Sequence, residues 1–423
     1  MILLWCRGSV EIGRSLVLIA MAVLVYGVLP SALVHAETKI FPLATASGRY
    51  DSNIFNRPAQ FAPVGRQISD FVSTVGGGVH LLHETRDLSA DLTVGGSFNA
   101  YVENSDLNFF NVNLRGGLNL DRWVDQYVRG ARLRITESFR YTPESPSFLV
   151  GVRQVGPAED DVFSRGISGF RANTFLNTTS VNGSYPMSRD LTLDGGYTFA
   201  LRRVGRIYGG DVGGVTFFDT NSHTWFGGPR YQLTRTDSVA AVYRQSFLSQ
   251  SPSDQPSRTF NTNFVTLAGH YNKVFPEWTF SVEGGISLVE PASRTFPSGT
   301  IRITTHPERT TVLNLVLSRE PKPSFYLEGG ALISNLARVG ISHRIYERLT
   351  VEADAAYAYN EFIPHTEGTF KHLAATAGLS YKLTRTITGN LLYAFHNIDT
   401  DRPDLSYQFS RHQVGFALTA EWN

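Results

Sequence analysis

The sequence contains very little sulfur. Its 423 residues include one cysteine, Cys6, and three methionines. A chain with a single cysteine forms no internal disulfide and no site built from several thiolates. The eleven histidines show no H-x-x-x-H spacing, so we expect no metal site. The sequence also shows no recognisable catalytic arrangement and no cofactor-binding motif, and we therefore expect neither an enzyme nor a bound cofactor.

Neither sign of charge is in excess. Lysine and arginine together number 38, and aspartate and glutamate number 37. Proteins that bind polyanions in general carry a clear basic excess. We therefore expect no nucleic-acid partner.

Long apolar runs are scarce, and the one that stands out is Ser15 to Leu29. Arg7 and Arg14 precede it, and the small-residue ending Val34-His35-Ala36 follows it. This order predicts a secretory signal peptide over residues 1–36, cleaved after Ala36. A membrane anchor is the alternative, but the run is shorter than the roughly 20 residues that a spanning helix needs.

What the sequence does contain is alternation, seen best over Leu88 to Tyr101. Leu92, Val94 and Phe98 alternate there with polar residues such as Thr93 and Asn99. A period of two over a whole segment indicates a strand with one apolar and one polar face. Fourteen residues at about 3.3 Å each, tilted by about 40°, rise roughly 35 Å and exceed the apolar band of about 25 Å of an outer membrane.

The same alternation recurs along the chain. We therefore predict an all-β fold, a transmembrane antiparallel up-and-down β-barrel over residues 37–423 with about eighteen strands. The number falls to sixteen if the short segment 299–306 is not a strand. Paired glycines such as Gly95-Gly96 and Gly284-Gly285 are interpreted as sites of barrel curvature. Further alternating segments are 111–120, 126–141, 191–202, 279–290, 350–359 and 387–396.

Connections of two kinds alternate with the strands. Tight, charged turns such as Glu84–Asp87, Asp121-Arg122 and Ser188–Asp190 are expected at the periplasmic end, and longer loops at the other end. The longer connections are expected near 142–169, 203–216, 249–259, 290–298, 361–367 and 397–405. The loop 142–169 is expected either to fold into the barrel or to lie outside it.

Charged residues fall on the polar face, which predicts a polar interior. Arginine or lysine facing lipid at mid-depth costs about 2–4 kcal/mol, so charges on the other face should lie near strand ends, as we expect for Arg129 and Glu137. If opposite charges face one another across the bore, they create a transverse field that orients solutes. The residues predicted to face the interior are Asp91, Arg115, Arg132, Arg134, Asp194, Arg202, Glu283, Glu352 and Asp354.

The last strand resembles the C-terminal targeting strand of outer-membrane barrels. Gly415, Phe416, Leu418 and Trp422 carry this resemblance, although Asn423 follows the final aromatic residue. It implies recognition by the barrel-assembly machinery. Aromatic residues beside the turns predict an interfacial girdle: Trp123, Tyr127, Trp278, Tyr346 and Tyr381.

Residues Gly48 to Phe55, GRYDSNIF, resemble the opening motif of the putative β-barrel porin 2 family. Tyr50, Asp51, Asn53 and Phe55 carry the motif. Ser69-Asp70 and Asn104–Leu107, each leading into a strand, fit the same family. The resemblance implies an accessory barrel of exopolysaccharide synthesis and export, with a polysaccharide substrate and export partners. From their chemistry alone, the four motif residues predict a strand end followed by a turn, in which Asp and Asn bond nearby backbone.

Three classes of function remain open. The first is a passive channel for hydrophilic solutes or a secreted polysaccharide, embedded in the lipid of a Gram-negative outer membrane. The second is a structural or plugged barrel of the polysaccharide machinery. The third is a membrane-embedded hydrolase whose site is assembled from separate strands. Barrels of sixteen to eighteen strands usually enclose water, which favours the channel.

Overall fold

The computed structural model describes residues 37–58, 65–143, 171–207, 218–252, 257–308, 310–323, 331–363, 368–402 and 405–422. The predicted signal peptide and nearly all of loop 142–169 lie outside these residues. Within them, no helix is long and apolar enough to cross a membrane.

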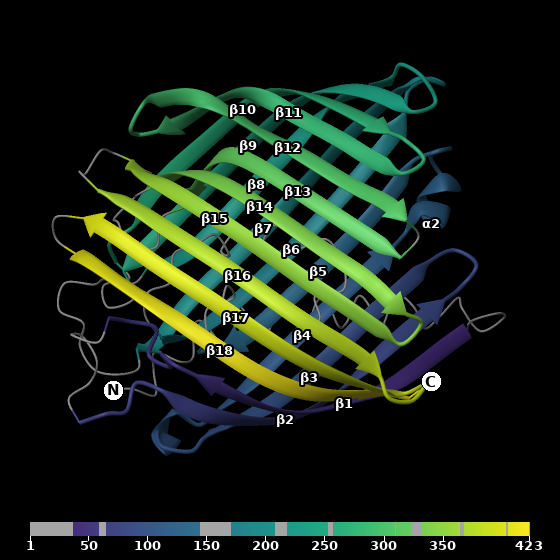
Figure 1. Cartoon of the computed structure of the whole chain (residues 1–423). Helices are drawn as coiled ribbons and strands as arrows, with labels where there is room; N and C mark the ends of the chain where they lie inside the picture. Colours follow the sequence, from purple (N-terminus) through teal and green to yellow (C-terminus); the bar gives the residue numbers. More distant parts are fainter. Residues whose placement is uncertain are drawn as a thin grey trace.

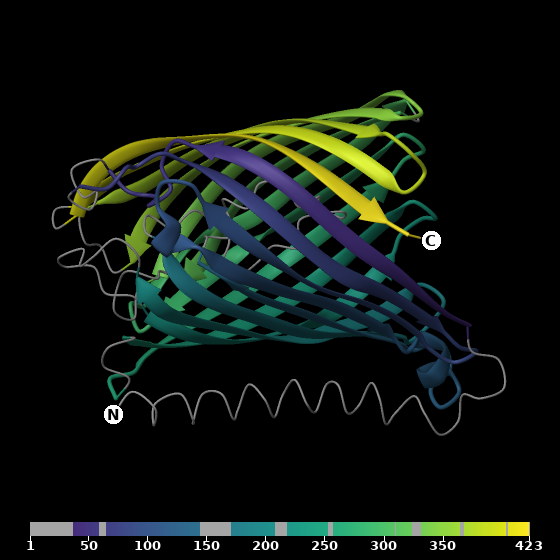
Figure 2. The same cartoon turned by 90° about the horizontal axis from the view of Figure 1, so that it is seen from below.

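The described residues form eighteen antiparallel strands in a single sheet. Each strand pairs with its neighbours in sequence, and β1 pairs with β18 to close a barrel. Figures 1 and 2 show tilted strands that curve round into a closed wall, with α2 and the C-terminus at the same end. The strands are β1 Glu37–Asp51, β2 Asp70–Glu84, β3 Ser89–Tyr101, β4 Phe109–Asn119, β5 Arg132–Thr142, β6 Ala172–Pro186, β7 Leu191–Ile207, β8 Phe218–Gln232, β9 Asp237–Pro252, β10 Phe260–Val274, β11 Trp278–Glu290, β12 Arg294–Glu308, β13 Thr311–Pro323, β14 Ala331–Tyr346, β15 Leu349–Ile363, β16 Thr369–Lys382, β17 Ile387–Arg402 and β18 Leu405–Glu421; the short helices are η2 Ser105–Leu107 and α2 Asp121–Asp125.

The predicted barrel with eighteen strands is confirmed. The alternative of sixteen is excluded because residues 294–308 form the complete strand β12, paired with β11 on one side and β13 on the other. The predicted loop 290–298 is accordingly wrong, and only residues 291–293 separate β11 from β12. The predicted loop 397–405 is wrong for the same reason, because β17 extends to Arg402 and β18 starts at Leu405. At both places a short polar stretch suggested a loop, but it belongs to strands in which the alternation continues.

One predicted turn is longer than expected. We expected a tight turn at Asp121-Arg122 and a strand from Gln126. Instead, Asp121–Asp125 form α2, and β5 begins only at Arg132. The Asp121 carboxylate accepts a hydrogen bond from the backbone N–H of Leu133 at 2.9 Å, which fixes the helix against the start of β5.

Four tight turns share one internal hydrogen-bonding pattern. In the turn between β2 and β3, the Thr85 hydroxyl accepts hydrogen bonds from the backbone N–H groups of Asp87 and Leu88, at 3.3 and 3.1 Å. A Ser or Thr hydroxyl closes its own turn in the same way, with an arginine as the next residue. The other three hydroxyls belong to Ser188, Thr234 and Thr384. We call this end of the barrel the turn end and the opposite end the loop end.

The two faces of the wall remain distinct all the way round. Residues paired in register point to the same side of a sheet, so the face of one strand fixes that of the next. Val94 is exposed and defines the outer face. The pairings between all eighteen strands are consistent with this definition, including the closing pair of β1 and β18. The outer face carries most of the exposed large apolar side chains. The five predicted girdle residues are exposed: Trp123, Tyr127, Trp278, Tyr346 and Tyr381.

The strand glycines include positions that no other residue could occupy without displacing backbone. A Cβ on Gly228 would lie 1.8 Å from the Ala241 carbonyl oxygen, and one on Gly285 would lie 2.0 Å from that of Leu267. Both glycines are on the inner, concave face. Their neighbours approach closely on this concave face. The role of the paired glycines in curvature stays a prediction, because a Cβ on Gly284 would meet nothing within 4 Å.

Glu137 departs from the prediction that outer-face charges lie near strand ends. It lies in the middle of β5 and points outward, whereas Arg129 precedes the strand altogether. Asn177 and Thr179 on β6 donate hydrogen bonds to its carboxylate. Neighbouring donors from the same face thus stabilise a carboxylate where lipid offers none.

The outer-face histidines have similar polar neighbours. In each case a ring nitrogen lies 2.7–3.0 Å from a hydroxyl on a neighbouring strand. The pairs are His83 with Thr38, His223 with Tyr197, His343 with Thr311, and His412 with Tyr393.

Candidate functional site: the barrel interior

The nine residues predicted to face the interior all lie on the inner face by register. Asp91, Arg115, Arg132, Arg134 and Glu352 are exposed, whereas Arg202 is buried near the loop end. The other three, on β7, β11 and β15, are half-buried. The turn-end half of the interior therefore presents charged groups to solvent.

Several interior charges form pairs along the wall. Arg230 on β8 lies 2.8 Å from Asp194 on β7, and Arg338 on β14 lies 2.8 Å from Asp354 on β15. Glu283 on β11 is 3.1 Å from Arg244 on β9. These contacts join strands that are one or two positions apart. They differ from the predicted arrangement of opposite charges across the bore, because adjacent strands lie only about 5 Å apart.

The loop end contains a buried ion pair at the seam where the barrel closes. Asp51, the last residue of β1, is fully buried and accepts hydrogen bonds from both Nε and Nη2 of Arg411 on β18. Gln413 donates a third, at 2.8 Å. Such a bidentate pair with an additional donor compensates the desolvation of both charges. It joins residues 360 positions apart in sequence.

The chain after Asp51 forms a compact turn. The Asp51 carboxylate accepts a hydrogen bond from the backbone N–H of Asn53 at 3.0 Å. The Asn53 side chain donates to the carbonyl of Arg57 at 2.7 Å and accepts from its N–H at 3.3 Å. Phe55 is buried, whereas Tyr50 is 48% exposed on the outer face. The motif residues thus form a strand end and a turn that leads inward.

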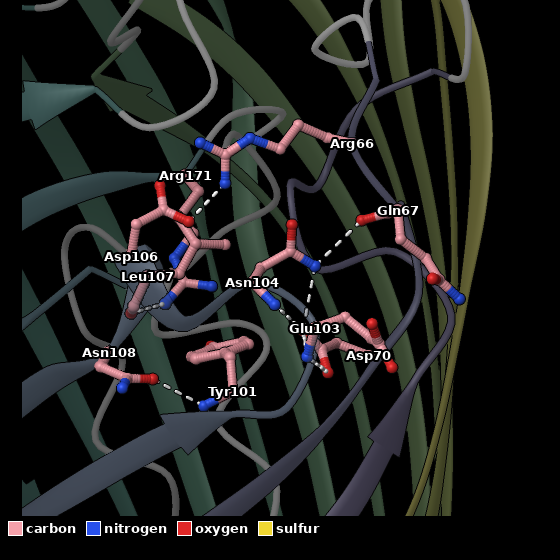
Figure 3. Close-up of polar contacts among 10 residues, drawn as sticks. All are labelled: Arg66, Gln67, Asp70, Tyr101, Glu103, Asn104, Asp106, Leu107, Asn108 and Arg171. Atoms are coloured by element: carbon pink, nitrogen blue, oxygen red, sulfur yellow. Dashed lines mark hydrogen bonds and ion pairs between the residues drawn. The ribbon is translucent and has the colours of Figure 1, made fainter.

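Phe55 belongs to a buried apolar cluster at this end. The cluster combines the turn after β1 with side chains of β2, β3 and β4; its members are Ile54, Phe55, Val72, Tyr101, Leu107 and Phe109. Arg171 is buried. Its guanidinium carbon lies 4.5 Å from the centre of the Tyr101 ring and 5.0 Å from the centre of the Phe109 ring. Its guanidinium also donates, at 3.5 Å, to the carbonyls of Ile54 and Leu107. One arginine therefore joins four segments of this cluster, which together form a cap at the loop end. Figure 3 shows Arg171 beside Tyr101 and Leu107.

Asp70 organises the adjoining connection between β3 and β4. Its carboxylate accepts hydrogen bonds from the backbone N–H groups of Val102, Glu103 and Asn104, at 2.9–3.3 Å. The Asn104 side chain donates to the same carboxylate at 2.9 Å, as Figure 3 shows. Arg66 pairs with Asp106 beside it, and this contact raises the pKa of the Arg66 guanidinium. The Asp70 and Asn104 stretches that suggested the family are thus in direct contact.

The wall overlaps itself at the loop end between β12 and β13. Pairing of these strands stops at Gly299 and Arg319, while β13 continues along β14 to Pro323. Ile333 on β14 is on the outer face by register, yet its exposed fraction is 0%. Its cluster combines inner-face side chains of β9–β12 with the ends of β14 and β15; the members are Leu248, Phe264, Val289, Phe296, Ala331, Ile333 and Ile363.

Two polar contacts support the overlap. Arg294, on the inner face of β12, lies 3.5 Å from Glu361, on the outer face of β15. The Arg319 guanidinium, on the outer face of β13, lies 5.9 Å from the centre of the Phe296 ring. The ends of β13–β15 therefore lie inside the wall formed by β9–β12, and the interior is narrowed at this point.

The residues that carry the resemblance to a targeting strand are divided between the two faces of the wall. Phe416, Leu418 and Trp422 are exposed on the outer face, at 57%, 47% and 46%. Gly415 is on the inner face, where a Cβ would lie 3.1 Å from that of Arg49. Recognition of this strand by the assembly machinery remains a prediction.

Histidines and carboxylates do not gather into a metal site in the described ranges. No group of three or more His, Cys, Asp or Glu side chains there could hold an ion. His372 and His396 lie side by side, with stacked rings and ring nitrogens 3.2 Å apart.

Residues 303–420 match the family described as putative beta-barrel porin 2. This match confirms the resemblance suggested by the sequence and extends from β12 to β18. The motif at Gly48 to Phe55 lies outside it, so a family role for those residues remains a prediction. The chain is a porin-like β-barrel. No curated protein matches it.

Solved barrels resemble the chain distantly. OccK2 (OpdF) of Pseudomonas aeruginosa is 10% identical, with 91% of this chain and 98% of that chain covered and a TM-score of 0.42. OpdQ of the same organism is 9% identical, with 92% and 97% covered and a TM-score of 0.43. A mutant of its ferric enterobactin receptor PfeA is 8% identical, with 92% and 81% covered and a TM-score of 0.45. Likenesses this distant assign no substrate to this chain.

The sequence did not reveal several residues that shape the interior. Arg411, Arg171 and Ile333 lack a local signal, because their partners are distant in sequence or belong to the other face of the wall. Asp70 is the exception, because it belongs to the stretch Ser69-Asp70 that resembles the family.

Proposed function

We propose that the chain is a passive channel for hydrophilic solutes in the outer membrane of a Gram-negative bacterium. The observation that carries this proposal is the unbroken separation of faces around a closed wall of eighteen strands. The outer face suits lipid, and the inner face presents exposed arginines and carboxylates at its turn-end half. Barrels of this size enclose an aqueous bore.

The loop end is the narrow part of the proposed path. The cap around Phe55 and Arg171 occupies the side of β1–β4, and the overlap around Ile333 occupies the side of β13–β15. Solutes entering from the wide turn end would meet these two features last. Short turns are periplasmic in barrels of this class, so the wide mouth would face the periplasm.

Conductance across a planar lipid bilayer tests the channel directly. The purified barrel should produce discrete steps of ionic current that persist without an energy source. A correctly folded barrel that never conducts would contradict the channel and favour a plugged structural barrel. Turnover of an ester or glycoside by the same preparation would instead favour the embedded hydrolase.

A finer proposal is that the cargo is a secreted polysaccharide. The resemblance of Gly48 to Phe55 to the porin family supports it, because that resemblance implies export accessories. A strain lacking the gene should then accumulate polymer in the periplasm and lose it from the surface. Normal surface polysaccharide in that strain would contradict this cargo while leaving the channel itself intact.

The proposal includes two signals that would direct the chain to the outer membrane. Residues 1–36 would direct secretion and be removed after Ala36, and Phe416, Leu418 and Trp422 would present the last strand to the barrel-assembly machinery. Mass spectrometry of the mature protein should give a chain that begins at Glu37. A retained N-terminal segment would contradict cleavage.

A further inference from the structure

The charged residues of the interior divide into a paired and an unpaired group. Asp194, Glu283 and Asp354 each have an arginine partner within 3.1 Å. Asp91 lies 3.2 Å from a ring nitrogen of His80. Asp194, Glu283 and Asp354 are therefore offset locally by arginine, whereas Glu352 has no ion pair among the described residues.

Three unpaired basic residues lie together on one side of the wall, whereas the exposed carboxylate of Glu352 lies on β15. Arg115 on β4 and Arg132 and Arg134 on β5 share the inner face, and all three are exposed. Across the described parts of the chain, no carboxylate forms an ion pair with any of them. They begin at the turn-end mouth with Arg132 and continue inward to Arg115.

The residues paired directly with these arginines are neutral, and the exposed carboxylate of Asp91 is opposite Gly117, one inner-face position from Arg115. Arg132 is opposite Ser184 and Arg134 is opposite Asn182 on β6, while Arg115 is opposite Thr93 on β3. Between the arginines, Gly117 has no side chain, and a Cβ there would lie 4.0 Å from Nη2 of Arg134. The guanidinium groups are therefore accessible to solutes in the bore.

We propose that this arginine row, Arg115, Arg132 and Arg134, binds oxyanions such as carboxylates and phosphates and makes the channel prefer anions. The proposal rests on the proposed channel function and names its substrate class. Guanidinium groups bind oxyanions through two parallel hydrogen bonds. A water-filled bore with a low-dielectric wall also concentrates the field of uncompensated charges.

The expected effect follows from Coulomb's law and screening. A solute ion about 8 Å from one guanidinium, in water at roughly 0.15 M salt, gains or loses an energy that changes the ratio of anion to cation permeability about twofold. Loss of all three arginines should therefore lower this ratio by about sevenfold. Salt at about 1 M should abolish most of the difference, since the screening length falls to about 3 Å.

The test measures the ratio of chloride to potassium permeability from the reversal potential in a KCl gradient. We expect the unaltered protein to prefer chloride and the variant with Arg115→Ser, Arg132→Ser and Arg134→Ser to lose most of that preference. A matched control removes an ion pair instead, by Asp194→Asn with Arg230→Asn, and should leave the ratio unchanged. A conducting protein that prefers potassium, or a triple variant with an unchanged ratio, would overturn the proposal.

Binding in detergent separates this proposal from the channel itself. Titration calorimetry of the purified barrel should detect succinate and inorganic phosphate, with affinity reduced severalfold in the triple variant, and should detect no sucrose. Arginine-dependent binding to a barrel that does not conduct would support the oxyanion site and refute the channel. Binding that is equal in the triple variant would refute the site, whatever the conductance.

Discussion

Val94 and Thr93 are neighbours on β3 that face opposite sides of the wall. Val94 is 37% exposed on the outer face and pairs with Val79 and Leu114. Thr93 points into the interior and is opposite Arg115. Replacing each in turn by arginine therefore tests the assignment of faces at a single level of the barrel.

The two substitutions should differ strongly in their effect on stability. Arginine facing lipid near mid-depth costs about 2–4 kcal/mol, which lowers the ratio of folded to unfolded protein roughly 30- to 700-fold. Arginine at position 93 remains in water and adds only repulsion from Arg115, which costs about 0.2–1 kcal/mol. The predicted difference in unfolding free energy is therefore at least about 1 kcal/mol.

Urea titration of the barrel folded into lipid vesicles measures this difference. Folded barrel is scored by its altered migration on unheated gels and by tryptophan fluorescence. Val94→Arg should shift the midpoint to much lower urea, and Thr93→Arg should shift it little. Equal shifts, or a larger shift for Thr93→Arg, would refute the assignment of faces.

Three further predictions concern a buried ion pair, an outer-face hydrogen bond and a buried apolar side chain. Asp51→Asn should cost about 3–5 kcal/mol because it leaves the Arg411 charge buried without its partner, and an unchanged melting temperature in detergent would contradict this. Thr179→Val should cost about 1–3 kcal/mol by removing a donor from the Glu137 carboxylate, and adding Glu137→Leu should restore most of the loss in the same assay. Ile333→Ala should cost about 2–5 kcal/mol as for a core residue, and a negligible effect on the urea midpoint would mean that the wall does not overlap.

The barrel was predictable because its main signal is local. Alternation with a period of two requires only neighbouring residues, so strands such as β3 and β18 and their two faces follow from short stretches. Strand ends were harder to place. Short polar stretches at 290–298 and 397–405 suggested loops, although the pairing with neighbouring strands continues through most of each.

The contacts of the interior were less predictable because they are long-range. Nothing near Asp51 in the sequence indicates Arg411. The alternation along β14 assigns Ile333 to the outer face. It is buried because β12 and β13 separate at the loop end and the wall overlaps there. Glu137 likewise contradicts a rule on charges that holds for most of the outer face, because Asn177 and Thr179 compensate it locally.

The seam between β1 and β18 also has a consequence for how the molecule assembles. Each other strand pairing described joins successive strands, so hairpins can form one after another, and turns such as Thr85–Leu88 are held by their own residues. Only the final step must bring together segments that were made first and last. The bonds from Arg411 and Gln413 to Asp51 exist only after that step, so protection of the Asp51 region from hydrogen exchange would report the completed cylinder and distinguish it from an open sheet.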